Sequence, residues 1–431
     1  MAPIQLKQTL LWAVLAACSY TQVSARPLDL DVGIDIDVNV DVNVDLTVDA
    51  SLVNLAIAAK LNMTGLGTLI AADRARAKQL KNAFLAPLGK RAQGNVNVQN
   101  TAVTYMASVG IGSPATTYNL LIDTGSANTW VGGDKTYTPS STSHDTGSAV
   151  SVTYGGGSFS GEEYTDRVDL GNGLVINDQS IGVAKQQKSF GNGIDGILGV
   201  GPASLTRGSL QSDPSATIPT VTDNLASQGT TSSAVLGMYY VPYAASDSTG
   251  VLTFGGADSS LYTGELAYVP ITQSQPSNQY WGVDQTVTYG GQTVMTQTAG
   301  IIDSGTTMIM FPSDAYNAYM KATGAVEDQN SGMLKLTKDQ YANLQPLDFH
   351  FGANTYTLTP NAQIWPRSLN TALGGDDNDV YLVIGDLGEN SGDGFDFING
   401  YLWMERFYTV FDTPNKQIGI ATTKYTNAEV N

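Results

Sequence analysis

The chain has very little cysteine and histidine, which argues against several kinds of catalytic site. Cys18 is the only cysteine among 431 residues, and His144 and His350 are the only histidines. Because Cys18 lies in an N-terminal stretch that we expect to be removed, the remaining chain has neither disulfides nor a cysteine nucleophile. The two histidines are not spaced like zinc ligands, and no Gly-x-Ser-x-Gly occurs where a strand would turn into a helix. A zinc protease and a Ser-His-Asp hydrolase are therefore disfavoured.

Charged residues are scarce, and basic residues are scarcer than acidic ones. The 21 Lys and Arg face 39 Asp and Glu, which gives a net charge of −18. Residues 1–91 hold nine of the basic and eight of the acidic residues, so residues 92–431 carry a net charge of −19. This surplus repels nucleic acid and anionic membranes. It suits an acidic medium, in which carboxylates protonate, although acidity that only supports solubility explains the surplus equally well.

Long apolar runs are lacking except near the N-terminus, where residues 1–25 resemble a secretory signal. Lys7 gives a positive start, Leu10 to Cys18 form a short apolar run, and Val23-Ser24-Ala25 offers small residues for cleavage. The run is too short to span a membrane, although a buried first helix is the alternative. The polar C-terminal end has no lipid-anchor tail. We expect an exported protein without a membrane anchor, which is either secreted or delivered to a vacuole.

Residues 26–91 read as a separate N-terminal part. Residues 28–50 alternate Asp or Asn with apolar residues, which we interpret as a poorly ordered spacer. Residues 52–88 have helical character and include a basic stretch from Arg74 to Lys81. Lys90-Arg91 is a dibasic pair typical of exposed processing sites, although an ordinary solvated pair is the alternative reading. From about residue 92 the sequence changes to short Val-, Thr- and Tyr-rich segments separated by Gly, which predicts an all-β fold.

Two short motifs in this all-β part are nearly the same. Residues 121–126 read Leu-Ile-Asp-Thr-Gly-Ser, and residues 301–306 read Ile-Ile-Asp-Ser-Gly-Thr. The apolar pair predicts the end of a buried strand, and the Gly permits a tight turn after the Asp. Two such carboxyls brought together cannot both ionise cheaply, so they would share a proton and act as acid and base. Asp123 and Asp303 are therefore the candidate catalytic residues, and capping of turns is the alternative role.

Over about residues 104–422 the chain resembles the precursor of a pepsin-type aspartic protease. The family's loops, flap and closing strands are matched in order at residues 123–131, 154–161, 195–199, 254–264, 301–307 and 407–421. The resemblance implies a bilobal fold of two related β-barrel-like lobes, residues 92–268 and 269–431, with the active-site cleft between them. The missing cysteines and the long spacer resemble secreted fungal members more than animal ones.

The resemblance also implies roles for the residues around the two aspartates. Thr124 and Ser304 should cross-link the two loops, and Ser126 and Thr306 should hydrogen-bond the carboxylates. Tyr154 should lie at the base of the flap with its phenol near Trp130. The remaining residues implied to bind substrate are Gly125, Gly155, Gly157, Ser158, Gly305 and Thr307.

In such enzymes the paired carboxyls share a proton and activate a water that attacks the peptide carbonyl, without a metal or cofactor. The implied function is a monomeric endopeptidase that acts on proteins and peptides at acidic pH. Gly156 stands where some fungal relatives carry an Asp that favours Lys, so we expect large apolar residues on both sides of the cut. Asn399-Gly400-Tyr401 replaces a frequent Leu-Gly-Asp, but the Gly remains, so activity should survive.

The resemblance also implies that a lysine of the propeptide occupies the catalytic pair, as in other family members. Lys78 and Lys81 are the candidates here, which makes the chain's own propeptide its inhibitor near neutral pH. Two other functions stay open: a relative that binds peptides without cutting them, and a β-rich carbohydrate-binding module. The first usually loses a catalytic Asp, its hydroxyl neighbour or the flap Tyr, all of which are present. The second leaves the duplicated motif unexplained.

Overall fold

The computed structural model of the chain describes residues 52–61, 69–83, 103–155, 157–188, 190, 193–245 and 249–431. The predicted signal, the spacer, Lys90-Arg91 and Gly156 lie outside these residues. Strands are the commonest secondary structure of the described chain, as the sequence predicts, and they belong to three sheets. No helix among the described residues is both long enough and apolar enough to cross a membrane.

The largest sheet has thirteen strands in the order β11-β23-β22-β9-β10-β1-β2-β3-β8-β4-β7-β6-β5, so it contains strands from both halves of the chain. In chain order its strands are β1 (Val53–Leu61), β2 (Val103–Ile111), β3 (Thr116–Asp123), β4 (Trp130–Val131), β5 (His144–Thr153), β6 (Ser158–Asp169), β7 (Val175–Lys188), β8 (Gly196–Gly199), β9 (Val235–Tyr239), β10 (Thr249–Phe254), β11 (Thr263–Pro270), β22 (Phe407–Asp412) and β23 (Gln417–Thr422).

The other two sheets belong to the second half of the chain. A seven-stranded sheet has the order β18-β17-β12-β13-β21-β14-β20, and a small sheet has the order β15-β16-β19. Their strands are β12 (Gly282–Tyr289), β13 (Gln292–Ile302), β14 (Ile309–Phe311), β15 (Val326–Glu327), β16 (Leu334–Leu336), β17 (Leu347–Phe351), β18 (Asn354–Leu358), β19 (Val380–Tyr381), β20 (Ile384–Asp386) and β21 (Ile398–Asn399).

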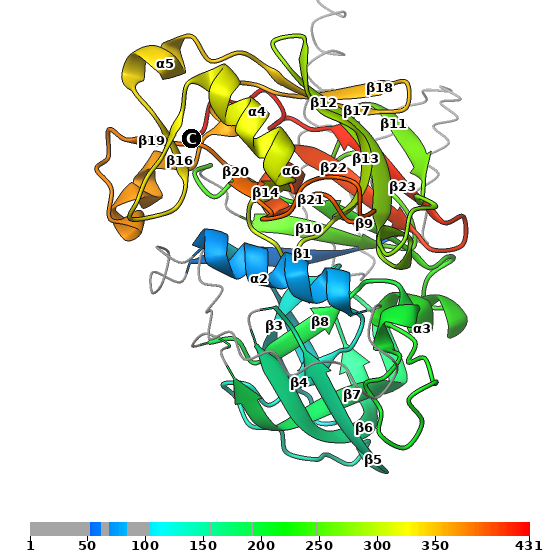
Figure 1. Ribbon diagram of the computed structural model, residues 1–431. Helices are drawn as coiled ribbons and strands as arrows, with labels where there is room; N and C mark the ends of the chain where they lie inside the picture. Colours follow the sequence, from blue (N-terminus) through cyan, green and yellow to red (C-terminus); the bar gives the residue numbers. More distant parts are fainter. Residues whose placement is uncertain are drawn as a thin grey trace, which may run out of the picture. The chain divides into compact units, whose positions relative to one another are not determined.

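Helices are short and lie mostly between strands. The α-helices are α2 (Leu69–Asn82), α3 (Val221–Ser227), α4 (Ser313–Thr323), α5 (Lys338–Ala342) and α6 (Tyr401–Met404), and the 3-10 helices are η2 (Ala203–Thr206), η3 (Ser277–Gln279), η4 (Asn361–Gln363) and η5 (Arg367–Leu373). Helix α2 is the longest of those described. Figure 1 shows it between strands β3, β4 and β8 of the first half and the strands of the second half.

The two Asp motifs lie in equivalent strand arrangements, which confirms the internal repeat. Strand β3 runs parallel to β8, with Asp123 opposite Gly199, and β8 also pairs antiparallel with β4. In the second half β13 runs parallel to β21, with Ile302 opposite Asn399, and β21 pairs antiparallel with β14. Asp123 is therefore the last residue of β3 and Asp303 directly follows β13, and both strands lie in the interior of their sheets. The expected lobe boundary at residues 268 and 269 falls inside strand β11, which pairs with β23.

The described N-terminal segment, residues 52–61 and 69–83, is not helical throughout. Strand β1 lies between β2 and β10 and is antiparallel to both, where the sequence predicted a helix. Leu55 and Ile57 are buried while Ala56 and Ala58 are exposed, which is the alternation of a strand. Pairing with two neighbouring strands therefore outweighs the helix preference of the three alanines in this stretch, and only α2 fulfils the helix prediction.

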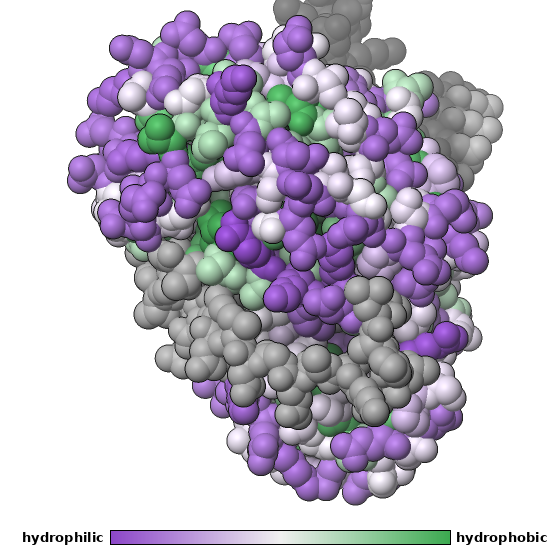
Figure 2. All heavy atoms as spheres, in the orientation of Figure 1, coloured by the Kyte–Doolittle hydropathy of each residue, from purple (hydrophilic) through white to green (hydrophobic). Residues whose placement is uncertain are grey.

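The face of the molecule shown in Figure 2 is mostly hydrophilic over its described residues, with apolar residues in small separate patches. Only two large apolar side chains among the described residues are more than about a third exposed, Tyr268 at 41% and Val326 at 65%. Apolar side chains of the described chain are thus mostly packed inside. The core extends through both halves and includes Leu55, Ile57, Leu69 and Leu80 of the N-terminal segment.

Strand β1 should contribute measurably to the stability of the full-length chain. Ile57 is 2% exposed, so Ile57→Ala leaves a cavity beneath the large sheet and should lower the free energy of unfolding by about 2–5 kcal/mol. The measurement is urea unfolding of the purified chain at neutral pH. Ala58→Ser, at the exposed neighbouring position, is the control and should change little. Equal stability of the two variants would show that β1 does not pack as described.

Candidate active site

Asp123 and Asp303 are both fully buried, and each carboxylate is held by its own turn. The hydroxyl of Ser126 donates to Oδ2 of Asp123 at 2.6 Å, and the N–H of Gly125 donates to Oδ1 at 2.9 Å. In the second half the hydroxyl of Thr306 donates to Oδ2 of Asp303 at 2.6 Å, and the N–H of Gly305 donates to Oδ1 at 3.1 Å. The two carboxylates thus have matching sets of donors, as the repeated motif predicts.

Thr124 and Ser304 join the two loops by reciprocal hydrogen bonds. The N–H of Thr124 donates to Oγ of Ser304 at 3.0 Å, and the N–H of Ser304 donates to Oγ1 of Thr124 at 2.9 Å. Each hydroxyl then donates to the opposite strand: Thr124 to the carbonyl of Ile302 at 3.3 Å, and Ser304 to that of Ile122 at 3.0 Å. All four bonds connect residues about 180 positions apart. The cross-link implied by the family resemblance is therefore present.

Glycine is required at both turns because the opposite carboxylate comes very close. A Cβ at Gly125 would lie 2.6 Å from Oδ1 of Asp303, and a Cβ at Gly305 would lie 2.6 Å from Oδ1 of Asp123. Contacts this short would push the two loops apart. The glycines therefore allow the close approach of the two acidic groups.

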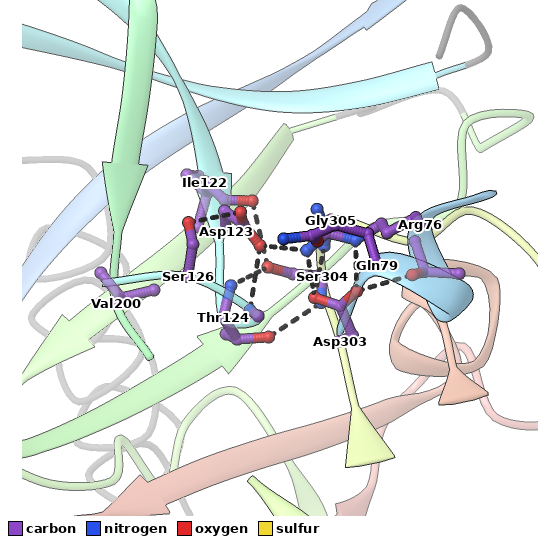
Figure 3. Close-up of polar contacts among 12 residues, drawn as sticks. Arg76, Gln79, Ile122, Asp123, Thr124, Ser126, Val200, Asp303, Ser304 and Gly305 are labelled. Carbon is purple, nitrogen blue, oxygen red and sulfur yellow. Dashed lines mark hydrogen bonds and ion pairs between the residues drawn. The ribbon is translucent and has the colours of Figure 1, made fainter. Parts of the chain in front are cut away.

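Arg76 of α2 fills the space between the two carboxylates (Figure 3). Its Nη2 donates to Oδ1 of Asp123 at 2.5 Å and to Oδ1 of Asp303 at 2.9 Å, and its Nε donates to Oδ2 of Asp303 at 2.7 Å. Its side chain is only 9% exposed. A guanidinium suits this place because its planar fork can bond two carboxylates at once.

The buried charges shift the pKa values of all three groups. Burial opposes ionisation of both aspartates, and Arg76 favours it. For Asp123, burial and the neighbouring Asp303 prevail, and the pKa is raised. For Asp303, the charge and hydrogen bonds of Arg76 prevail, and the pKa is lowered. The two carboxylates in turn raise the pKa of Arg76, so the guanidinium stays charged.

The flap residues lie where the resemblance implies and contact the N-terminal segment. Tyr154 follows β5, and its N–H donates to the carbonyl of Gly157 at 2.7 Å across the turn before β6 begins at Ser158. The side-chain amide of Gln79 in α2 donates to the carbonyl of Thr153 at 2.6 Å. A Cβ at Gly155 would lie 2.0 Å from Cα of Arg76, so the flap backbone rests directly on α2.

An aromatic cluster lies beneath the flap. Trp130 is fully buried and stacks on Phe159 with ring centroids 4.6 Å apart. Phe190 meets Trp130 edge-on at 4.9 Å and Tyr154 at 5.6 Å. Tyr154 and Trp130 therefore belong to one apolar group, as expected, and Phe190 is a member that the sequence did not single out. Burial raises the pKa of Tyr154 well above its usual range, so its phenol stays neutral.

Further polar contacts hold α2 against the second half of the chain, among them the hydroxyl of Tyr280, which donates to the carbonyl of Leu80 at 2.8 Å. The carboxylate of Asp73 accepts from the backbone N–H groups of Thr307 and Met308 at 3.3 and 2.8 Å. Arg74 pairs with Asp386 at 3.0 Å. Lys81 pairs with Glu389 and, at 2.8 Å, with Asp393.

The expectation that Lys78 or Lys81 occupies the catalytic pair is wrong, because Arg76 does so. Lys78 is exposed on the opposite side of α2, and Lys81 reaches the two acidic residues outside the pair. The sequence contained a signal for the correct residue. Leu69, Asp73, Arg76 and Leu80 are spaced like one face of a helix, and all four are buried. The helix face that carries the apolar residues Leu69 and Leu80 therefore also carries Asp73 and Arg76.

Comparison with known proteins agrees with this geometry. The family model described as eukaryotic aspartyl protease matches residues 104–423. The chain is 56% identical to polyporopepsin of Irpex lacteus over 342 residues, which cover 79% of this chain and all of that one. It is 31% identical to rhizopuspepsin-1 of Rhizopus niveus over 86% of this chain and 95% of that one. It is 29% identical to pepsin A of Sus scrofa over 74% and 80% of the two chains.

The fold is also that of a solved member of the family. The crystal structure of the aspartic proteinase from Irpex lacteus superimposes with a TM-score of 0.74 and 55% identity, over 76% of this chain and 96% of that one. The all-β, bilobal fold expected from the sequence is thereby confirmed. The chain belongs to the eukaryotic aspartyl protease family and is a fungal pepsin-like aspartic endopeptidase.

Proposed function

We propose that Asp123 and Asp303 are the catalytic pair of this endopeptidase. The observation that carries the proposal is the cross-linked pair of loops, which places two buried carboxyls so close that one guanidinium bonds both. Once Arg76 has left, the two groups face each other without a cation between them. Two carboxylates this close together repel each other, so they are expected to share one proton, as in other aspartic proteases.

The shared proton gives the pair both roles that peptide hydrolysis needs. The ionised carboxyl takes a proton from a water held between the two groups, and the protonated one donates to the carbonyl oxygen of the scissile bond. Attack by the water gives a tetrahedral diol, and the pair then protonates the leaving amine. Ser126 and Thr306 favour ionisation by donating to the carboxylates, and the glycine turns keep the groups close. The pair titrates as one unit, so activity should follow a bell-shaped pH profile below neutrality.

Large apolar side chains are the best partners for the cleft. Tyr154, Phe159 and Phe190 form with Trp130 an apolar group at the base of the flap. Burying an aromatic or large aliphatic substrate side chain against these rings is favourable by about 1.5–3 kcal/mol. Once the flap releases α2, its backbone at Gly155, Gly157 and Ser158 becomes free to pair with an extended substrate, as an added strand would.

The N-terminal segment is, in this proposal, an inhibitory propeptide that ends near Lys90-Arg91. The protein would be made with a signal peptide, exported as an inactive proenzyme and freed of residues 26–91 outside the cell or in a vacuole. Support comes from Arg76 in the catalytic pair, from the flap resting on α2, and from the pairing of Arg74 and Lys81 with acidic residues of the second half. A substrate could not reach the two aspartates while α2 occupies this position.

The pKa shifts indicate when the inhibitory contact weakens. The pKa of Asp303 is lowered when α2 is docked, so its contribution is complete above its usual pKa of about 3.9 and is lost as the pH falls through the lowered value. The contribution of Asp73 to docking changes with pH in the opposite direction. Burial raises its pKa to about 7, so its contribution is complete below about 3.9 and is lost as the pH rises through about 7. The pKa of Asp123 is also raised when α2 is docked, so its contribution depends on pH in the same direction as that of Asp73. Only protonation of Asp303 favours release in acid, so release should need a pH below about 4.

Replacing either catalytic carboxyl should abolish cleavage while the fold survives. Asp123→Asn and Asp303→Asn each remove the shared proton, and we expect acid-activated protein to lose at least about 1,000-fold in kcat, since two coupled proton transfers fail. Peptide hydrolysis at several acidic pH values measures this, and circular dichroism checks the fold. Substantial turnover by either variant would refute the assignment.

Cleavage should prefer large apolar or aromatic residues on both sides of the cut. A peptide library digested by the mature enzyme at acidic pH should show Phe, Leu or Tyr next to the scissile bond. Phe190→Ser removes one ring of the apolar group and should weaken this preference several-fold while peptides with small residues change less. A profile dominated by Lys before the cut would overturn the assigned substrate class.

Arg76 rather than Lys78 should keep the proenzyme closed. Removing one partner of a buried ion pair is strongly destabilising, by about 3–5 kcal/mol, so Arg76→Gln should open the cleft already at neutral pH. The measurement is binding of a labelled transition-state inhibitor to intact proenzyme, which should tighten at least about tenfold. Lys78→Gln removes the same charge from the exposed side of α2 and is the matched control.

The wild-type proenzyme should bind that inhibitor only below about pH 4, and the Lys78→Gln proenzyme should behave alike. Equal binding by all three proteins at neutral pH would show that Arg76 does not close the cleft. Opening of the wild type already near pH 6 would contradict the role given to Asp303.

A further inference from the structure

Tyr240 has a buried hydroxyl that the catalytic site has not yet accounted for. The residue directly follows β9 and is 1% exposed, and its hydroxyl has no hydrogen-bond partner among the described residues. Buried hydroxyls are normally paired, so an unpaired one needs a physical reason. Burial raises the pKa of Tyr240 above its usual value, so the phenol keeps its hydrogen and can donate it.

The polar groups that act on this phenol belong to the catalytic loops. After burial, the influences on the pKa of Tyr240 are the hydroxyl of Ser304, which lowers it, and the charges of Asp123 and Asp303, which raise it. A hydrogen-bonding influence requires close approach of the two hydroxyls. The phenol of Tyr240 therefore lies beside the junction that keeps the two carboxyls together.

Ser304 can accept one more hydrogen bond. Its hydroxyl donates to the carbonyl of Ile122 at 3.0 Å and accepts from the N–H of Thr124 at 3.0 Å. A hydroxyl has one hydrogen and two lone pairs, so these two bonds leave one acceptor position on Oγ of Ser304. Tyr240 offers a donor that lacks an acceptor, and Ser304 offers the acceptor.

The departure of Arg76 favours a bond between the two hydroxyls. While α2 is docked, the guanidinium offsets the negative charge of Asp123 and Asp303. In the enzyme without α2 the pair keeps a negative charge that no cation offsets. A buried O–H beside such a charge is most favourable when its hydrogen points toward the charge, which is the direction of Ser304.

We propose that Tyr240 is a positioning residue of the mature enzyme, whose hydroxyl donates to Oγ of Ser304 and favours the ionised state of the catalytic pair. This inference rests on the proposed function. Tyr240 acts through Ser304, because that hydroxyl joins the second loop to Ile122 and Thr124 of the first. The bond would keep this junction in one geometry and direct the positive end of the phenol dipole toward the carboxyls.

Tyr105 offers a matched control, because its ring stacks on that of Tyr240 with centroids 3.9 Å apart and an interplanar angle of 5°. Its hydroxyl is directed elsewhere: it donates to the carbonyl of Val241 at 2.5 Å and also contacts Oε1 of Glu405 at 2.8 Å. Burial raises the pKa of Glu405 to about 7, so this acid is already neutral at acidic pH. Tyr105→Phe thus removes a neighbouring buried phenol that does not face the catalytic pair.

The test measures peptide hydrolysis by acid-activated wild type, Tyr240→Phe and Tyr105→Phe across the acidic pH range. Without the phenol dipole the pair ionises less readily. In Tyr240→Phe, kcat/KM should therefore fall about three- to tenfold, and the acidic limb of the pH profile should move up by about half a pH unit. Tyr105→Phe should keep the wild-type profile, although it should unfold at a lower urea concentration because Val241 and Glu405 lose a partner.

A double-mutant cycle tests whether Tyr240 acts through Ser304. The loss of kcat/KM caused by Tyr240→Phe should be much smaller in Ser304→Ala, where the acceptor is already gone. Since the phenol is unpaired in the proenzyme, Tyr240→Phe should leave urea unfolding of the proenzyme at neutral pH unchanged.

Four results would overturn the role of Tyr240. They are a wild-type pH profile in Tyr240→Phe, an equal shift in Tyr105→Phe, an equal loss in the Ser304→Ala background, and a Tyr240→Phe proenzyme that does not fold, since the hydroxyl would then have a structural partner. A wild-type enzyme that cleaves no peptide would refute the proposed function instead.

Discussion

Burying two carboxyl groups against each other is unfavourable, and the arrangement around Asp123 and Asp303 offsets that cost. Each group accepts from a hydroxyl and a backbone N–H of its own turn, so the ionised form has partners even without water. The turns in turn stay together only because Thr124 and Ser304 bond across the junction. The large sheet contains strands from both halves of the chain, and one of its strands, β3, ends at Asp123. Separation of the halves would separate the charges and end the chemistry.

In the proposed function, the arginine between these carboxyls explains why an inhibitory segment would be effective at this place. A buried, bidentate ion pair depends on both partners, so the free cleft, with two facing carboxyls, binds a cation strongly. Arg76 stays charged throughout the accessible pH range, so only the acidic partners can weaken the contact. On the proposed function, the same shared negative charge would perform hydrolysis in acid and hold the inhibitory segment near neutral pH. Catalysis and inhibition would then use one electrostatic feature in two protonation states.

The sequence predicted the site where its information is local. The Asp-hydroxyl-Gly turns, their donors and the repeat were predictable because each motif is a strand end followed by a turn, and the pairing of β3 with β8 repeats in β13 with β21. Strand β1 was not predictable, because its partner β10 lies about 190 residues away and alanines favour a helix when read alone. Phe190 was missed because only the packing of a distant loop brings it to Trp130.

The choice between Arg76 and the lysines depended on which residues share the buried face of α2. By their spacing, Asp73 and Arg76 lie on the same face as Leu69 and Leu80, and Lys78 does not. This face carries Asp73 and Arg76 about one turn apart, and the contacts that these two residues make respond to pH in opposite directions. Acid weakens the contact of Arg76 with Asp303 but strengthens that of Asp73 with Thr307 and Met308. Between about pH 4 and pH 7 the contribution of Asp303 is constant and that of Asp73 grows as the pH falls, so α2 should stay docked in mild acid and leave only when Asp303 takes up a proton.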